Sequence, residues 1–169
     1  DLVVLATPVD CIVPQAKQIA RWMKPGSVIT DVGSTKAAIV AALDRSLPKA
    51  VAFVGGHPVA GSEQRGIESA CAQMFDGSFC VLTPTRRTQA KALKQVATLW
   101  KRVASAVVIL APNTHDRLLG ATSHLPHLLA FALASAITPE GLPQAPRSFL
   151  DMTRIAKSDP DLWDDILLS

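Results

Sequence analysis

Short strand-like runs alternate with helical patterns through the first part of the chain. Residues 2–6 form a continuous apolar run, and residues 27–32 and 51–54 indicate two further short strands, with apolar side chains at helical spacing between them. This order with short connections is typical of parallel βαβ units, whose right-handed crossovers place the strands in one sheet. The sequence therefore predicts an α/β fold with helices on the faces of a parallel sheet.

The segments between residues 67 and 110 continue the pattern of helices and strands. Residues 67–74 indicate a short helix, and Thr88 indicates the N-cap of another helix. Residues 79–82 and 106–110 indicate two more strands.

After Pro112 no strand-like run follows. A long helix is expected over about 113–136 with Pro126 inside it, and a further helix near Phe149. We place the domain boundary near Ala111, so that residues 1–111 form the α/β domain and residues 112–169 an all-helical one.

Composition excludes several classes of function. The 169 residues are 49% hydrophobic and carry a net charge of +3, too small to indicate a nucleic-acid or membrane partner. The apolar stretch 125–137 is shorter than the roughly 20 residues that span a bilayer, and no secretory signal opens the chain. Cys11, Cys71 and Cys80 have no C-x-x-C spacing, which favours reduced thiols in a cytoplasm.

Unusual residues follow three predicted strands. Thr7-Pro8, the segment 31–36 (DVGSTK) and the segment 55–58 (GGHP) all lie where parallel sheets bind ligands, at the carboxyl ends of their strands. The two glycines before His57 would let the backbone pass close to a ligand, and a neutral imidazole there would accept a proton from a substrate hydroxyl. The alternative is a histidine that only hydrogen-bonds a loop.

Ser34 and Lys36 open a predicted helix. They form either an anion site at a helix N-terminus or an N-cap beside a solvated lysine. The chain has no Walker loop, and Ser62 lacks the G-x-S-x-G elbow of a hydrolase.

Two further groups of residues lie in the helical part. His124 and His127 share a helix face, but no nearby ligands complete a metal site. Arg154, expected at the start of the last helix, suits carboxylate recognition or a surface ion pair with Asp151.

The basic residues between 86 and 102, in the α/β part, indicate a solvated helix face rather than a nucleic-acid site.

Taken together, DLVVLATPV, DVGSTK, GGHPVAGSE with Gly66, SHLPH and DMTRIAKSDPDLW resemble the prephenate dehydrogenase family, which includes prephenate, cyclohexadienyl and arogenate dehydrogenases. The resemblance implies part of a Rossmann-type domain followed by a helical dimerisation domain. It also implies NAD- or NADP-dependent oxidative decarboxylation of prephenate to 4-hydroxyphenylpyruvate, or of arogenate to tyrosine, by a cytoplasmic homodimer.

The resemblance also assigns roles to residues. His57 matches the family's catalytic histidine and Ser34 its partner serine, while Arg154 and His127 match residues that contact the substrate. Ser62 stands where the family often has threonine, and Glu63 at an acidic position of the pocket.

For the cofactor, the resemblance implies Thr7, Pro8 and Gly33 at the nicotinamide end. The G-x-G-x-x-G turn that binds the pyrophosphate is not in the sequence. We therefore expect the chain to be a fragment, starting at the fourth Rossmann strand, that binds dinucleotide poorly and does not reveal the choice between NAD and NADP.

Two alternatives remain open from the sequence. One is a different Rossmann dehydrogenase of the β-hydroxyacid type, for which Lys157 is a candidate catalytic lysine. The other is a non-catalytic dimerisation or ligand-sensing module.

Overall fold

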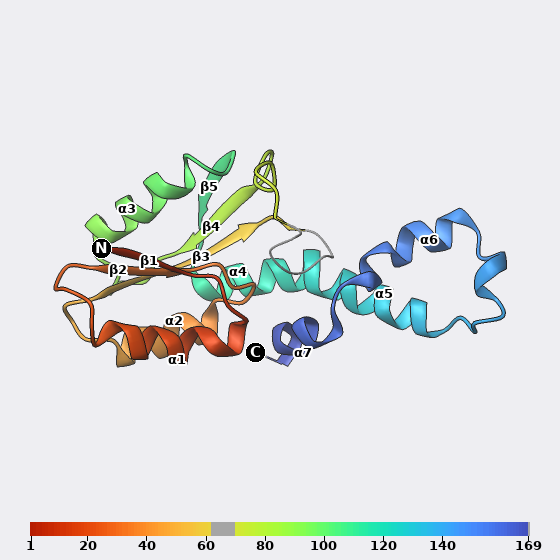
Figure 1. The fold of residues 1–169 in the computed structure, drawn as a ribbon, viewed down its shortest axis with the longest axis horizontal. Helices are drawn as coiled ribbons and strands as arrows, with labels where there is room; N and C mark the ends of the chain where they lie inside the picture. Colours follow the sequence, from red (N-terminus) through yellow and green to blue (C-terminus); the bar gives the residue numbers. More distant parts are fainter. Residues whose placement is uncertain (62–69, 169) are drawn as a thin grey trace.

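The computed structural model describes residues 1–61 and 70–168, which form an α/β part and a helical part (Figure 1). In the α/β part, helices α1 (Val9–Ala20) and α2 (Ala37–Ser46) cover one face of a five-stranded sheet, and helix α3 (Ala90–Trp100) covers the other. The expected α/β class with a mainly parallel sheet is confirmed.

The sheet has the order β1-β2-β3-β4-β5. Strands β1 (Leu2–Leu5), β2 (Val28–Asp31) and β3 (Ala52–Val59) are parallel, because each is joined to the next through a helix. Strands β4 (Phe79–Thr83) and β5 (Ala106–Ile109) are parallel to each other, but β4 is antiparallel to β3.

Strand β3 changes its pairing partner halfway along. Residues 52–54 pair with β2, whereas residues 55–59 pair with β4. The sequence predicted a short strand over residues 51–54, with the GGHP segment after its end. The strand is longer than predicted, because β4 supplies hydrogen-bond partners that continue it through His57.

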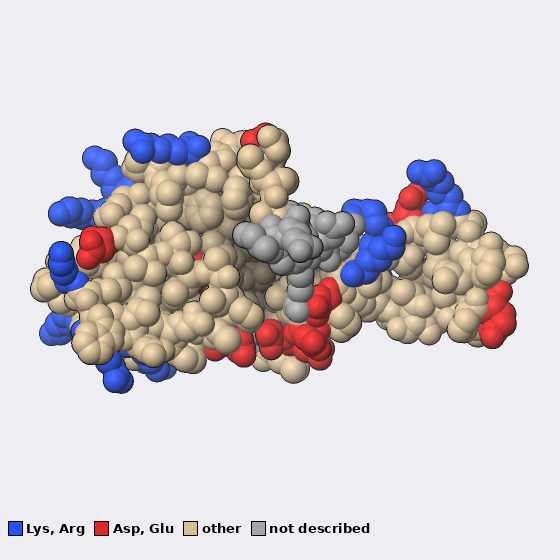
Figure 2. Space-filling view, in the orientation of Figure 1, with Lys and Arg blue, Asp and Glu red and all other residues tan. Residues whose placement is uncertain are grey.

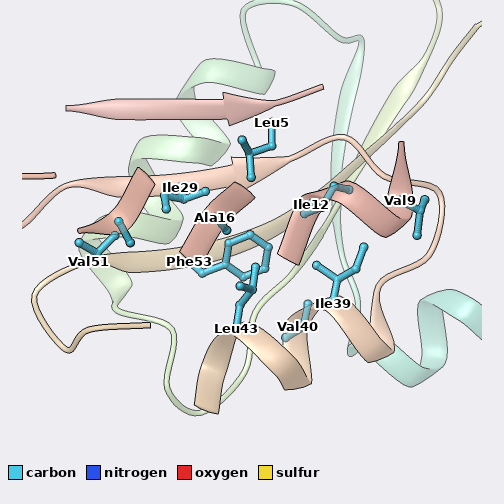
Figure 3. Packing of buried hydrophobic residues seen from close by; sticks show 11 residues of the cluster. Leu5, Val9, Ile12, Ala16, Ile29, Ile39, Val40, Leu43, Val51 and Phe53 are labelled. Atoms are coloured by element: carbon cyan, nitrogen blue, oxygen red, sulfur yellow. The ribbon is translucent and has the colours of Figure 1, made fainter. Parts of the chain in front are cut away.

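Two hydrophobic clusters hold the layers together. One lies between the sheet and helices α1 and α2, where Ile12, Ile29 and Leu43 are almost fully buried (Figure 3). The other lies beneath α3, around Val54 and Val96. Apolar side chains recur on the inner face of each helix, and their burial fixes the helices on the sheet.

The helical part begins with a continuous helical stretch. Helix α4 (Pro112–Leu119) leads into a π-helical turn, η2 (Gly120–His124), and then into α5 (Leu125–Ser135). This agrees with the long helix expected over 113–136. The π-helical turn ends two residues before Pro126, whose missing N–H leaves a carbonyl of the preceding turn without its usual partner.

The rest of the chain folds back along α5 (Figure 1). Short helices η3 (Leu142–Gln144), α6 (Arg147–Thr153) and η4 (Arg154–Lys157) lead to α7 (Pro160–Leu168). Arg154 thus follows the end of α6. The sequence predicted Arg154 at the start of the last helix, and that prediction was wrong, because the last helix is α7.

Two local predictions also differ from the structure. Residues 70–74 form no helix, while the rest of the predicted helix over 67–74 lies outside the described residues. Helix α3 has Gln89 as its N-cap. The hydroxyl of Thr88 instead accepts a hydrogen bond of 2.9 Å from the backbone N–H of Thr85, which closes the turn before the helix.

Candidate active site

A pocket of about 400 Å³ lies where the end of strand β3 meets the helical part. Four of the residues predicted to be functional line it, namely Ser34, His57, His127 and Arg154. They come from the loop after β2, from β3, from α5 and from η4. The pocket is completed by side chains of α4 and α7 and by the π-helical turn, among them Leu119, Ser123, Leu162, Trp163 and Ile166.

His57 is 9% exposed and is held close to the sheet. The two preceding glycines, Gly55 and Gly56, pack closely against neighbouring parts of the chain. A Cβ on Gly55 would lie 2.4 Å from Oγ1 of Thr83, and one on Gly56 would lie 2.8 Å from the carbonyl oxygen of Asp31. These glycines therefore allow close packing of the protein's own chain at the base of the site.

One ring nitrogen of His57 contacts a second histidine that lies far away in the sequence. Nδ1 of His57 is 2.8 Å from Nε2 of His115 on α4. Nδ1 of His115 is 2.7 Å from Oδ1 of Asp116. A carboxylate only accepts hydrogen bonds, so His115 donates to Asp116.

The same carboxylate caps helix α2. Oδ1 and Oδ2 of Asp116 accept hydrogen bonds of 2.8 Å from the backbone N–H groups of Lys36 and Ala37. Partial burial raises the pKa of Asp116, but the hydrogen bonds from His115, Ala37 and Lys36 outweigh it and hold the pKa below its usual value. Asp116 is thus an anion at a helix N-terminus, where the helix dipole also favours it.

A buried ion pair lies beneath the site. Nζ of Lys36 contacts Oδ2 of Asp31, and both side chains are 0% exposed. Asp31 also accepts hydrogen bonds of 3.0 Å from the N–H groups of Gly33 and Gly56. Burial lowers the pKa of Lys36, and the charge of Asp31 opposes that change. Lys36 is therefore neither the solvated side chain nor the open anion site considered from the sequence.

The surroundings of His57 keep its imidazole neutral. Burial lowers the pKa of His57 to about 3, and the nearby His115, Lys36 and His124 act in the same direction. Among the described residues, Asp116 is the group that acts in the opposite direction. A neutral ring has one nitrogen that donates and one that accepts, which is the state required of a proton acceptor.

Aromatic rings form the wall of the pocket opposite the sheet. His127 stacks on Trp163 with ring centroids 3.8 Å apart and an interplanar angle of 22°. His124 meets the same indole edge-on at 5.9 Å. Nδ1 of His127 lies 2.9 Å from the carbonyl oxygen of Ser123, so this nitrogen donates and the ring orientation is fixed.

In the described part of the chain, three of the other predicted site residues, Thr7, Pro8 and Gly33, lie outside the pocket lining. The hydroxyl of Thr7 is 3.0 Å from Oε1 of Gln15, and Pro8 precedes α1. Ser62 and Glu63 lie outside the described residues.

Sequence reasoning missed His115, Asp116 and Trp163. Neither His115 nor Asp116 belongs to a motif quoted from the sequence, and only the contact between α4 and the α/β part brings them to His57. Trp163 ends the quoted DMTRIAKSDPDLW stretch, and its place in α7 was the available signal.

The fold and the pocket define a class: a Rossmann-type α/β part joined to a helical part, with a buried histidine where they meet. Comparison with known families identifies the family to which each part belongs. Residues 1–110 match the family model of the prephenate dehydrogenase nucleotide-binding domain, and residues 111–169 match that of the prephenate dehydrogenase dimerization domain. The chain belongs to the prephenate dehydrogenase family.

Individual relatives agree with this assignment. The chain is 37% identical to a prephenate dehydrogenase of Bacillus subtilis over 98% of its own length and 47% of the relative's. It is 34% identical to a cyclohexadienyl dehydrogenase of Zymomonas mobilis over 99% of its length and 59% of the relative's. The chain thus spans about half to three fifths of these proteins.

Solved structures show the same fold. Prephenate dehydrogenase from Aquifex aeolicus in complex with hydroxyphenyl propionate and NAD⁺ superposes with a TM-score of 0.88 at 41% identity, covering 99% of this chain and 60% of that one. Arogenate dehydrogenase from Synechocystis superposes with a TM-score of 0.81 at 26% identity, covering 99% of this chain and 62% of that one.

Proposed function

We propose that this chain forms the substrate-binding and proton-accepting part of a dehydrogenase that oxidatively decarboxylates prephenate or arogenate. One observation carries the proposal: a neutral, buried imidazole and a guanidinium line the same pocket, on opposite parts of the fold. Both substrates have a ring hydroxyl to be oxidised and carboxylates to be held. Family membership and the relatives named above support the same reaction.

His57 is the proposed proton acceptor. Its Nδ1 is engaged with His115, which leaves Nε2 for a hydrogen bond from the ring hydroxyl of the substrate. Ser34 lines the same pocket and supplies a hydroxyl that would orient the same oxygen. As the hydroxyl proton moves toward His57, the ring carbon that bears the hydroxyl loses a hydride. Loss of carbon dioxide then makes the ring aromatic.

Arg154 and His127 are the proposed substrate-holding residues. A guanidinium presents parallel N–H donors that match a carboxylate in a bidentate pair. The stacked His127–Trp163 pair gives the substrate ring a flat, apolar wall. Ser62 and Glu63 keep their proposed polar contacts to the substrate from the resemblance alone, since both lie outside the described residues.

The cofactor of the reaction is NAD or NADP, which accepts the hydride when bound. This chain's residues fit only part of such a group. Thr7 and Pro8 follow β1 at the carboxyl end of the sheet, where the nicotinamide end would lie. The sequence contains no G-x-G-x-x-G turn to hold the pyrophosphate, so we propose that the chain binds dinucleotide only weakly by itself.

We also propose that the protein acts as a homodimer in the cytoplasm. Several large apolar side chains of α5 are exposed, with Leu125 at 49%, Leu128 at 47% and Leu129 at 60%. Figure 2 shows large uncharged areas on the helical part between its few charged groups.

The segment Pro112–Ser135 is long and apolar enough to cross a membrane by length and composition. The same segment carries His115 and His127, which are tied to the pocket. The helical part matches the family model of a dimerization domain. We therefore propose that a second copy of this part, rather than lipid, covers the exposed apolar face.

The β-hydroxyacid alternative is not supported by the site. Lys157 is exposed in η4 and, among the described residues, is not part of the pocket lining. The catalytic lysine that such an enzyme requires is therefore not where a substrate would bind.

The test is turnover by the full-length protein with prephenate and with arogenate, each supplied with NAD and with NADP. We expect reduced nicotinamide to form with at least one pair. His57→Asn should lower kcat by about 10²-fold or more with little change in the KM for the cofactor. Arg154→Gln should raise the KM for the substrate by about 10-fold or more.

A matched control is Arg117→Gln on the exposed side of α4, which should leave both parameters unchanged. Absence of turnover with all four pairs, or near-normal turnover by His57→Asn, would contradict the proposal.

A further inference from the structure

A row of four hydrogen-bonding groups links α2 and β3 of the α/β part through two residues of the helical part. It runs from the N-terminus of α2 through Asp116 and His115 to His57, with successive distances of 2.8, 2.7 and 2.8 Å. His115 is 0% exposed and Asp116 is partly buried, so water does not compete for the contact between the two histidines. The protons in this row therefore have few alternative arrangements.

We propose that Asp116 and His115 are positioning residues that fix the tautomer of His57, placing its proton on Nδ1 and leaving Nε2 as the acceptor. The inference rests on the proposed function, and it adds a role for two residues of the helical part. The tautomer of His57 depends on which group donates and which accepts in each hydrogen bond of the row.

The direction is set at the Asp116 end. Both carboxylate oxygens accept hydrogen bonds from the N–H groups of Lys36 and Ala37, which holds the carboxylate in place. Oδ1 also faces Nδ1 of His115, which must carry a proton to make this contact. With that proton on Nδ1, the Nε2 of a neutral His115 is an acceptor.

The acceptor state of Nε2 on His115 then determines which nitrogen of His57 donates. An accepting Nε2 on His115 requires a proton on Nδ1 of His57. The other ring nitrogen, Nε2, then carries a lone pair. Without His115 as acceptor, a neutral His57 would be free to hold its proton on Nε2, where it would meet the substrate hydroxyl as a donor.

The other charged and titratable groups around His57 in the described residues do not set this direction. Lys36, beneath the site, is paired with Asp31, and His124 on the π-helical turn packs on Trp163. These groups affect how readily His57 takes up a second proton. In the part of the chain that the structure describes, His115 is the group within hydrogen-bonding distance of Nδ1, and the choice between the two neutral tautomers of His57 depends on it.

The competing explanation is that His115 and Asp116 only fasten α4 to α2. Both explanations predict a loss of stability when the residues are replaced. Only the positioning role predicts a change in which nitrogen of His57 carries the proton, and only that role predicts rescue by a side chain that accepts a hydrogen bond but does not titrate.

The first measurement is ¹⁵N NMR of the full-length protein with labelled histidine, with the His57 signals assigned from the His57→Asn variant. At neutral pH we expect His57 to be protonated on Nδ1 and unprotonated on Nε2. In His115→Phe, a substantial fraction of the His57 proton should move to Nε2. An Nε2-protonated His57 in the unaltered protein, or no change in His115→Phe, would overturn the inference.

The second measurement is turnover by two replacements of His115. Phenylalanine removes the acceptor, while glutamine offers a neutral amide oxygen to Nδ1 of His57. We expect His115→Phe to lower kcat by about 10²-fold with the substrate KM changed only a few-fold, and His115→Gln to recover at least tenfold of that loss. Equal kcat values for the two variants at equal thermal stability would contradict the positioning role.

Failure of the inference and failure of the proposed function give different results. If the unaltered protein turns over neither substrate but His57 has the expected tautomer, the reaction assigned to the protein is wrong and the tautomer assignment stands. If turnover is normal and His57 carries its proton on Nε2, the positioning role alone is wrong.

Discussion

Nδ1 of His57 lies 2.8 Å from Nε2 of His115, although the two residues are 58 positions apart in the chain. His57 is on β3 of the α/β part, and His115 is on the first helix of the helical part. The contact therefore makes the environment of the proposed proton acceptor depend on both parts. A change in how the helical part sits on α2 would reach His57 directly, through Asp116 and His115.

The lowered pKa of His57 predicts a loss of stability in acid. The unfolded chain takes up a proton near the usual histidine pKa of ~6.5, whereas the folded protein resists protonation until the pH approaches about 3. The contribution is thus fully present above pH ~6.5 and is lost as the pH falls below it. Between pH 6 and 4.5 the free energy of unfolding should fall more steeply than in His57→Asn, by up to about 1.4 kcal/mol per pH unit.

The measurement is urea unfolding of the full-length protein and the variant at several pH values. His124, whose pKa is also lowered mainly by burial, is present in both proteins, so its effect cancels in the comparison. Parallel pH dependences for the two proteins would show that His57 titrates as it does in the unfolded chain.

Lys36→Met should strongly destabilise the protein. The substitution leaves the carboxylate of Asp31 buried without its cation, at a cost of about 3–5 kcal/mol. The double variant Lys36→Met with Asp31→Asn should recover part of this loss, because the uncompensated charge is removed. Chemical unfolding measures both, and Lys49→Met, at an exposed position, serves as the control expected to change little. A loss below about 1 kcal/mol in Lys36→Met would contradict the importance of the pair.

Gly55→Ala should also be destabilising, through overlap rather than charge. The added Cβ would lie 2.4 Å from Oγ1 of Thr83 and 2.8 Å from Cγ2 of Val40, and such overpacking costs about 1–3 kcal/mol. Adding Thr83→Ala should relieve part of the overlap, so the two changes should not be additive.

Gly120→Ala is the matched control for Gly55→Ala, since nothing lies within 4 Å of the Cβ it would add. Thermal unfolding compares the three variants. If Gly55→Ala proves as stable as Gly120→Ala, the close packing of β3 against α2 and β4 does not constrain this position.

Leu129→Glu tests the proposed dimer. Leu129 is 60% exposed on α5, so a charge there costs little in a single chain but is unfavourable within an apolar interface. We expect the dissociation constant of the dimer to rise at least about 10-fold, measured by sedimentation velocity over a range of concentrations. Trp22→Glu, at an 87% exposed position beyond α1, should leave the oligomeric state unchanged. Equal dissociation constants for the two variants would place the interface elsewhere.

Much of the α/β part could be predicted from the sequence because its signals are local. The apolar runs of β1 and β2 predict strands, and the spacing of Ile12 and Ala16 marks the inner face of α1. Strand β2 is buried throughout, whereas Val4 of β1 is 41% exposed, so the apolar run of β1 does not mark a strand buried on both faces. The change of strand direction was not predictable in this way. Strand β4 has the same kind of apolar pattern as its neighbours, so its own residues do not reveal that it pairs antiparallel with β3.

The sequence by itself determined the layered α/β class, the change to helices after Pro112, and the choice of His57, Ser34, His127 and Arg154 as candidates. Hydrophobic periodicity and short motifs are properties of neighbouring residues, so they can be recognised without coordinates. Only the tertiary structure decided that Lys36 is a buried cation, that Gly55 packs against the protein's own side chains, and that His115 contacts His57. Each of these depends on which distant segments meet, and burial and hydrogen-bond direction arise only once they do.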